Sequence, residues 1–512
     1  MTGKLRICLI SREYPPVTGF GGIATFANHL ALGLTALGHE VEVVALARDG
    51  DKAKTVEDTG IRVHRVEPYE IEGALGAVAL CMPYSRYVLR SSSALWKKFV
   101  ELHRANPFDV VDTPELLAEG IIPAVTKAAP LLIRLYTPHS KFIAEQLHNV
   151  TASFDHQFVA MLERVAMLSA DVITSPSDDL ADFVSRDLNY PREVIRIVRN
   201  PIDTDKFSPE GDKALASDGR KLVLFIGRLE ERKGIAYLVD AIPKVAKSFP
   251  DVRFVIVGDD TNNARGQTSV LAELKESIER HDVSRYVEFL PRVPLGELPN
   301  YYRSADICVV PSVYDNSPCT CLEAMSCGKP VIGTSSGGTP EYLGDSGILV
   351  PPRNSDAIAQ ALISLLHNEP EQQRLGSQAR ARVLEKFDRK EIARQTLELY
   401  NQARTNFLER RELAIYRKPI QHALLDADAL LYAYDQQLYD LLYAQSFRFR
   451  VKHWWTLTTK RPRLTIAKLF VAFARLAFRT IGHAPEKART LIEKLDEDIR
   501  IKQRRAAPES IR

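Results

Sequence analysis

Short apolar runs alternate with longer segments of helical periodicity along most of the chain. Leu5–Ile10, Glu40–Leu46 and Lys221–Ile226 are brief and partly β-branched, which predicts buried strands. Between the first two, apolar residues recur at helical spacing up to Gly38, and Ile235–Ser248 follows the third in the same way. Strand, helix and strand in this order form a parallel βαβ unit, so the pattern predicts an α/β fold.

This pattern occurs twice, on either side of a segment with low apolar content. Asn200–Asp203 contains two turn-forming pairs, and Pro209–Gly219 continues the apolar-poor segment. We therefore expect a linker near Ser208–Arg220, and a further long helix over Arg389–Glu412. The predicted units are two Rossmann-like domains and a helical C-terminal extension: residues 1–207, 208–400 and 401–512.

The amino-acid composition limits the classes of protein to which the chain can belong. The 512 residues are 45% hydrophobic and carry a net charge of +3, which suits two or three globular domains and does not indicate bulk nucleic-acid binding. Six cysteines lack the paired spacing of a zinc site, so reduced thiols and a cytoplasmic location are expected. The apolar run at the N-terminus is too brief for a signal peptide, and none is long enough to span a bilayer.

The most informative stretch is Pro311–Gly347. A strand at Ile307–Val310 precedes it, and ligands of parallel sheets lie beyond the carboxyl ends of strands. The loop there carries Asp315, eight residues before Glu323 in the following helix. Carboxylates accept paired hydrogen bonds from vicinal hydroxyls, as in sugars. Two structural alternatives stay open: a capping box from Thr320 to Glu323, and a turn begun by Asp315.

Other loops carry groups that are suited to binding an anion. Arg228 and Lys233 lie five apart in a glycine-flanked loop after a strand, and a rigid fork beside a mobile ammonium suits a diphosphate. The alternative is a solvated charged turn. Gly21 and Gly22 precede a helix, where backbone amides can approach an anion, but the full dinucleotide fingerprint is missing. Gly337–Glu341 forms a similar glycine turn.

His139 directly follows the predicted strand Leu131–Leu135. Lone histidines are more often structural than functional. The carboxyl end of a strand is nevertheless the usual place for a ligand-binding side chain in this architecture, so His139 is a candidate site residue.

Jointly, these motifs resemble a known family over roughly Leu5 to Tyr400. The acidic-x7-Glu block and the Arg-x4-Lys pair are similar to those of glycosyl transferases group 1, family 4, which are retaining glycosyltransferases with the GT-B fold. The resemblance implies two Rossmann-like domains facing across a cleft, with the acceptor on the N-terminal side and the donor on the C-terminal side. The family usually has Glu where this chain has Asp315.

The resemblance also implies an activity and a role for each residue. The activity is transfer of a sugar from a nucleoside-diphosphate sugar to an unidentified acceptor hydroxyl, with no metal and no cofactor. The catalytic candidates are Arg228, Lys233, Asp315 and His139. The donor-binding candidates are Gly21, Gly22, Asn316, Ser317, Cys319, Thr320, Glu323, Gly337 and Gly338.

The resemblance does not explain the C-terminal segment. Residues 441–485 contain no Asp or Glu but many Lys and Arg, and Ile466–Ala477 has an apolar face opposite basic residues. Two interpretations stay open: peripheral contact with an anionic surface at the inner face of the membrane, or packing against the protein or a second copy. Nucleic acid is not expected.

Two other functions also remain open. One is a GT-B epimerase or phosphorylase; the phosphorylase would need a lysine that binds pyridoxal phosphate. The other is a non-catalytic protein that binds sugar nucleotides or membranes, for which the shortened Asp315 is the support.

Overall fold

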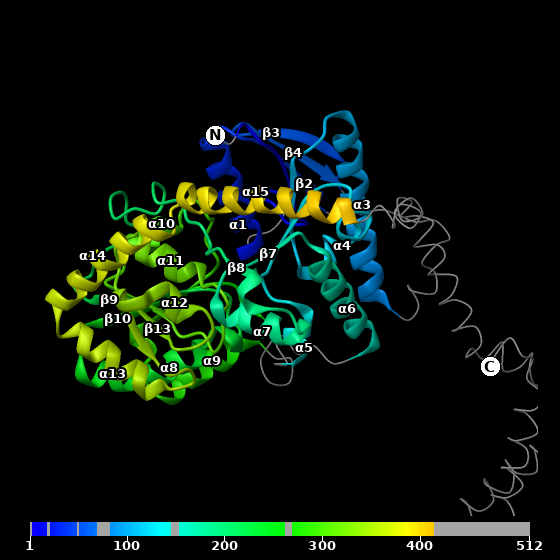
Figure 1. Ribbon diagram of the computed structural model, residues 1–512. Coiled ribbons are helices and arrows are strands. Elements are labelled where there is room, and N and C mark those ends of the chain that lie inside the picture. The colour runs from blue at the N-terminus through cyan, green and yellow to red at the C-terminus, as the bar shows by residue number, and fades with distance from the viewer. Residues whose placement is uncertain are drawn as a thin grey trace, which may run out of the picture. The chain divides into compact units, whose positions relative to one another are not determined.

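The computed structural model describes residues 3–17, 21–48, 51–68, 82–144, 153–261 and 269–413. The segment 441–485, and with it the predicted membrane or self-association contact, lies outside these residues. Figure 1 shows two sheets, each covered by helices. We call the first sheet with its helices the first lobe, and the second sheet with its helices the second lobe. Within the described residues, no helix is both long and apolar enough to cross a bilayer.

The first lobe is built on an eight-stranded sheet with the order β3-β4-β2-β1-β5-β6-β7-β8, parallel except for the β3–β4 pair. Its strands are β1 (Arg6–Ile10), β2 (Glu40–Leu46), β3 (Lys54–Asp58), β4 (Ile61–Val66), β5 (Val110–Pro114), β6 (Leu131–Arg134), β7 (Val172–Ser175) and β8 (Ile195–Ile197). Its helices are α1 (Gly22–Ala36), α3 (Pro83–Ala105), α4 (Ile121–Thr126), α5 (His139–Ala144), α6 (Phe154–Ser169), α7 (Asp178–Leu188) and α15 (Arg389–Leu413), with 3₁₀ turns η1 (Leu116–Ala118) and η3 (Arg192–Val194).

The second lobe is built on a six-stranded parallel sheet with the order β11-β10-β9-β12-β13-β14. This is the 3-2-1-4-5-6 order of a Rossmann sheet. Its strands are β9 (Lys221–Ile226), β10 (Val252–Val257), β11 (Val287–Leu290), β12 (Ile307–Val310), β13 (Val331–Thr334) and β14 (Ile348–Val350). Its helices are α8 (Ile235–Ser248), α9 (Val270–Arg280), α10 (Leu298–Ser304), α11 (Cys319–Ser326), α12 (Thr339–Leu343), α13 (Ser355–Leu366) and α14 (Glu369–Lys386), with 3₁₀ turns η4 (Glu231–Lys233), η5 (Ser284–Tyr286) and η6 (Gly344–Ser346).

Both faces of the central strands are buried, which is why these strands are continuous apolar runs, whereas the edge strand β3 is exposed along its length. In β1, Cys8 and Ile10 belong to one core cluster, while Ile7 and Leu9 belong to another on the opposite face. The central strand β1 pairs in parallel with β2 and β5, so that Ile7 lies opposite both Val41 and Val110 in register. A strand covered on both sides has no polar face to alternate with.

The last described helix, α15, belongs to the first lobe. It packs on α1 (Figure 1), and Ile392, Tyr400 and Ala403 join the core cluster that contains β1. Tyr400 Oη also donates to Asp112 Oδ2 at 2.7 Å. The helix expected over Arg389–Glu412 therefore forms, and it returns to the first sheet before the expected end of the second domain at residue 400.

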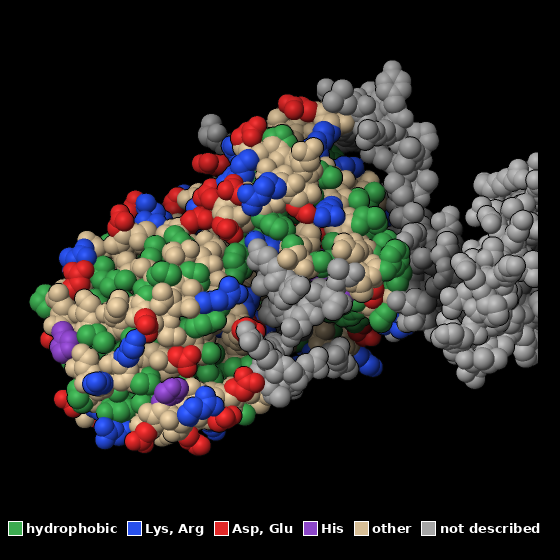
Figure 2. Space-filling model, turned by 90° about the horizontal axis from the view of Figure 1, so that it is seen from below, with side chains coloured by type: hydrophobic (Ala, Val, Ile, Leu, Met, Phe, Trp, Pro, Cys, Tyr) green, Lys and Arg blue, Asp and Glu red, His purple; other side chains and the backbone are tan. Residues whose placement is uncertain are grey.

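The chain passes between the lobes twice, and the two passages are hydrogen-bonded to each other. Ile202 N donates to Phe387 O at 2.9 Å, and Arg389 N donates to Ile202 O at 3.0 Å. The surface shown in Figure 2 carries acidic and basic side chains interspersed, in keeping with the small net charge.

Candidate functional site

A cavity of about 560 Å³ lies where loops of the two lobes meet. Its walls come from the start of α1 in the first lobe and from segments that follow β9, β10, β11 and β12 in the second. Ligands of parallel sheets bind at these carboxyl ends. The described lining residues are Gly21, Gly22, Thr25, Ile226, Gly227, Arg228, Arg232, Lys233, Val257, Gly258, Asp259, Arg292, Val293, Pro294, Leu295, Leu298, Asp315, Ser317, Cys319, Thr320 and Glu323.

The two predicted cations line this cavity together. Arg228 follows β9, and its side chain is 57% exposed, with Nη2 3.4 Å from Glu230 Oε1. Lys233 ends the turn η4, and Gly234 follows it with φ +68°. A Cβ at Gly234 would lie 1.9 Å from Pro311 O, so only glycine lets the Lys233 turn lie against the segment after β12.

Asp315 is buried beside these cations. Its Oδ2 accepts a hydrogen bond from Lys233 Nζ at 2.5 Å and lies 3.8 Å from Arg232 Nη1. Burial raises the pKa of the carboxyl group, but the charges of Lys233 and Arg232 outweigh it and hold the pKa below its usual value. The predicted turn also forms, because Oδ1 accepts from Ser317 N at 3.3 Å. Asp315 is therefore an ionised carboxylate that forms an ion pair with Lys233.

Glu323 is the second buried carboxyl group. Its Oε2 accepts from Tyr302 Oη at 2.6 Å. Burial raises its pKa to about 7, against the lowering effect of the Tyr302 hydrogen bond. The capping-box alternative is wrong, because α11 has Pro318 as its N-cap and no side-chain cap, and Thr320 lies inside the helix. Glu323 thus lines the cavity, and its carboxyl group is hydrogen-bonded to Tyr302.

The glycines of the first lobe lie close to this loop. A Cβ at Gly22 would come 3.9 Å from Cys319 Sγ, and Asn200 Nδ2 lies 3.6 Å from the same sulfur. Burial raises the pKa of Cys319 to about 12, so the group is a neutral thiol at neutral pH. Among the described residues, no group of three or more His, Cys, Asp or Glu side chains is arranged to hold a metal ion.

Three predicted residues shape the loop instead of lining the cavity. Asn316 Nδ2 donates to Tyr136 O and Thr137 Oγ1 in the first lobe. Gly337 has φ +57°, and a Cβ there would lie 2.3 Å from Asp315 O. Gly338 N donates to the same oxygen at 2.9 Å. The two glycines let the second loop lie against the backbone of residues 315 and 316.

His139 differs most from expectation. Its ring packs against Tyr84 and His156, and its Nε2 lies 2.7 Å from His156 Nδ1. Burial is the main cause that lowers its pKa to about 4. The histidine is not among the described residues that line the cavity, so this geometry gives no support to its expected place beside a reacting sugar.

Comparisons with known proteins follow the same two-lobe division. The model for Glycosyltransferase Family 4 matches residues 20–206, and the model for Glycosyl transferases group 1 matches residues 208–382. The chain belongs to the GT-B group 1 glycosyltransferase family. It is an enzyme that transfers glycosyl groups.

Individual relatives match over nearly their whole length. An uncharacterised glycosyltransferase of Methanocaldococcus jannaschii is 26% identical over 407 residues, 77% of this chain and 98% of its own. Sucrose-phosphate synthase of Thermosynechococcus elongatus has the same fold with a TM-score of 0.62 and 23% identity, over 78% of this chain and 99% of its own. HepE of Anabaena, solved in complex with UDP-glucose, has a TM-score of 0.57 and 17% identity over the same shares.

Several residues that line the cavity of this glycosyltransferase were not predicted from the sequence. Arg232 donates through Nη2 to Glu230 Oε1 at 2.9 Å and through Nη1 to Tyr314 O at 3.1 Å, which fixes its guanidinium beside Asp315. Gly258 and Asp259 directly follow β10, and Arg292 follows β11. The signal was present, because every strand of a parallel sheet ends at the ligand edge, and polar residues after each strand are candidates.

Proposed function

We propose that the enzyme is a retaining glycosyltransferase that moves a sugar from a nucleoside-diphosphate sugar to an acceptor hydroxyl. One observation carries the proposal: Arg228, Lys233, Asp315 and Glu323 line a single cavity together with Gly21 and Gly22 of the other lobe. The complex of HepE with UDP-glucose adds support, since that protein has the same fold.

The cations would act on the leaving group. Breaking the bond between the anomeric carbon and the diphosphate leaves negative charge on the departing oxygen, and fixed positive groups stabilise that charge in the transition state. Arg228 is largely exposed at the cavity and suits bidentate contact with a phosphate. Lys233 supplies a mobile point charge beside it.

The carboxylates would hold hydroxyl groups. Binding of a diphosphate draws Lys233 toward the ligand, which releases the Asp315 carboxylate to accept hydrogen bonds from the donor sugar. Glu323, on the first turns of α11, accepts from the ribose. With the acceptor approaching on the leaving-group side, the diphosphate oxygen takes the acceptor proton, and the configuration of the sugar is retained.

Neutralising both cations tests this function. First, a thermal-shift panel of UDP-, GDP-, ADP- and TDP-sugars identifies the donor that the wild-type chain binds. We then expect Arg228→Ala with Lys233→Ala to lower turnover by about 10²–10³-fold, since each removes a group that stabilises the leaving diphosphate. Turnover is measured as release of free nucleoside diphosphate with and without acceptor.

Lys244→Ala is the matched control, because Lys244 pairs with Asp356 on the exposed outer side of α8 and α13. Like Lys233→Ala alone, it removes one lysine charge, but it should leave turnover unchanged. If the double variant retains wild-type nucleotide affinity and turnover, the proposed function is wrong.

A further inference from the structure

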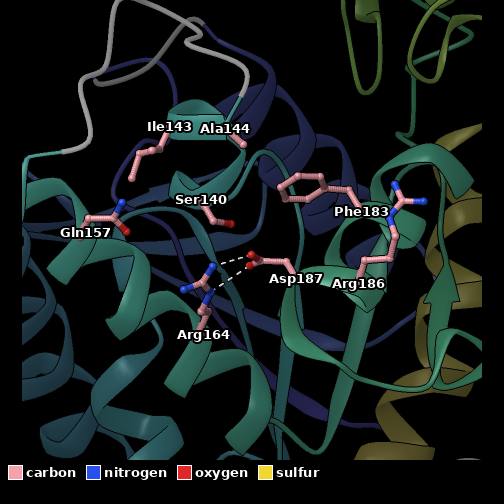
Figure 3. Close-up of a pocket in the computed structure, with 8 residues that line it drawn as sticks. All are labelled: Ser140, Ile143, Ala144, Gln157, Arg164, Phe183, Arg186 and Asp187. Carbon is pink, nitrogen blue, oxygen red and sulfur yellow. Dashed lines mark hydrogen bonds and ion pairs between the residues drawn. The ribbon is translucent and has the colours of Figure 1, made fainter.

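A second cavity, of about 390 Å³, lies within the first lobe among α5, α6 and α7 (Figure 3). Its described lining residues have no member in common with those of the cavity above. Its walls come from α5, which follows β6, and from later turns of α6 and α7. The side chains that line it decide whether it is a candidate ligand site.

A charged pair forms one side of this cavity. Arg164 donates to Asp187 through two atoms, Nε to Oδ2 at 3.0 Å and Nη2 to Oδ1 at 2.5 Å. The third guanidinium nitrogen points away from Asp187 (Figure 3). The two charges compensate each other, and Arg186 is directed away from the pair in the same view. The side chains around the cavity centre therefore suit an uncharged ligand that both donates and accepts hydrogen bonds.

A buried hydroxyl group points toward this pair. Ser140 is 8% exposed, and within the described part of the chain its Oγ has no hydrogen-bond partner. Figure 3 shows that the oxygen faces Arg164 and Asp187. A buried polar atom without a partner is destabilising, and a ligand hydroxyl at this position would supply the missing hydrogen bond. Ser93 in α3 also has a buried hydroxyl group without a hydrogen-bond partner among the described residues, but it lines neither of the two cavities.

The remaining walls combine apolar and amide groups. Phe183 offers an aromatic ring, and Ile143 and Ala144 add aliphatic surface. Gln157 contributes an amide that can both donate and accept. A saturated ring with hydroxyl groups has an apolar C–H face and a polar edge, so these walls match its two sides.

We propose that this cavity binds an uncharged polyhydroxylated ring, a pyranose or a cyclitol, belonging to the sugar acceptor. The link to the reaction is α5. Lys141, next to Ser140, lies with Nζ 4.4 Å from the ring centroid of Tyr314, the residue before Asp315. The cavity and the Asp315 loop thus contact the same short helix. The assignment of the ligand as an acceptor rests on the proposed function; its binding does not.

Direct binding tests the site without any donor. The full-length protein is titrated with methyl α-D-glucopyranoside, maltose and myo-inositol, followed by saturation-transfer NMR and calorimetry. We expect at least one of them to bind, and the one that binds identifies the ring as a pyranose or a cyclitol. Ser140→Ala and Asp187→Asn should each weaken that binding about tenfold, as expected for a lost hydrogen bond to a charged or buried group.

Two matched variants serve as controls. Ser93→Ala removes a buried orphan hydroxyl elsewhere, and Asp182→Asn removes a carboxylate from α7 that pairs with Arg192. Both should bind like the wild type. Thermal melting with the donor identified above reports the other cavity, and Ser140→Ala should leave that shift intact. If the donor does not raise the melting temperature of the wild type, the result counts against the proposed function. If no ring binds the wild type, the result counts against this site.

The proposal is overturned if none of the three rings binds the wild type, or if Ser140→Ala binds as tightly as Ser93→Ala. Asp187→Asn also breaks an ion pair and could lower stability. Ser140→Ala, which removes only an unpaired hydroxyl, is therefore the deciding variant.

Discussion

The ion pair between Asp315 and Lys233 has a consequence for ligand binding. Lys233 Nζ lies 2.5 Å from Asp315 Oδ2, with Arg232 close by. A diphosphate entering the cavity competes with an internal anion for the same ammonium group.

Replacing Asp315 separates its two proposed roles. In Asp315→Asn the competing charge is gone, so we expect free nucleoside diphosphate to bind about tenfold tighter, a change of about 1.4 kcal/mol. Turnover should fall, because the amide no longer accepts paired hydroxyl hydrogen bonds from the sugar. Calorimetry with the nucleotide and initial rates with the donor measure the two effects. Unchanged affinity together with unchanged turnover would show that Asp315 has no role at the site.

Glu323 makes nucleotide binding depend on pH. Burial raises its pKa to about 7, and the ionised form accepts ribose hydroxyls best, so affinity should be highest above pH 7 and decrease as the pH falls below it. Tyr302→Phe removes a hydrogen bond that lowers this pKa, so the midpoint should move to higher pH. Calorimetry from pH 5.5 to 8.5 measures both. In Glu323→Gln the profile should be flat across this range, and a persisting midpoint near 7 would assign the titration to another group.

At the scale of elements, α1 and α15 meet at a glycine. A Cβ at Gly33 would lie 2.4 Å from Arg389 O and 3.0 Å from Ala393 Cβ. The glycine therefore sets the distance between the two helices, and α15 covers one face of the first sheet through this contact.

An alanine at this position should force the helices apart. We expect Gly33→Ala to lower the free energy of unfolding by about 1–3 kcal/mol, as for other overpacked contacts. Gly296→Ala is the control, since a Cβ there has no atom within 4 Å. Urea denaturation of both variants measures the difference. Equal stability of the two variants would mean that α15 does not pack this tightly on α1.

The elements also show what could be predicted from the sequence. Strands β2 and β9 and helix α8 have the expected bounds, because unbroken apolar runs and clear helical periodicity are local signals. Helix α3 was missed, since its buried face includes Ser85 and Ser91–Ser93 where apolar residues are usual. Residues next to strand ends, such as Arg228 and Asp315, could be placed at the site. The position of His139 depends on tertiary contacts with Tyr84 and His156, for which no local pattern exists.

At the scale of the whole described structure, α12 of the second lobe joins the two lobes. Tyr342 Oη accepts from Asn200 N at 3.0 Å and from Ser317 Oγ at 2.6 Å, and it donates to Pro176 O at 3.1 Å. The Glu341 carboxylate of the other lobe accepts from the backbone N–H of Asp178 in the first turn of α7, next to the N-cap residue Ser177. A cavity residue, the passage between lobes and the first lobe are thus connected through one hydroxyl group.

Removing that hydroxyl should affect both stability and binding. Tyr342→Phe leaves buried backbone groups without a partner, which should cost about 1–3 kcal/mol of the free energy of unfolding. It also releases Ser317, so we expect a higher KM for the donor. Tyr286→Phe is the control, because its hydroxyl bonds only to the side chain of Arg285 among the contacts described. A donor KM equal to that of the control would show that Tyr342 does not position the cavity loop.

The membership of α15 in the first core has a consequence for synthesis on the ribosome. A nascent chain that has emerged through β8 contains every strand of the first sheet and also α1, but not α15, which completes the cover of one face. The part of that face beneath α15 stays uncovered while almost two hundred further residues are translated. The second half of the polypeptide, which contains its own complete Rossmann sheet, can therefore finish folding before the first half does.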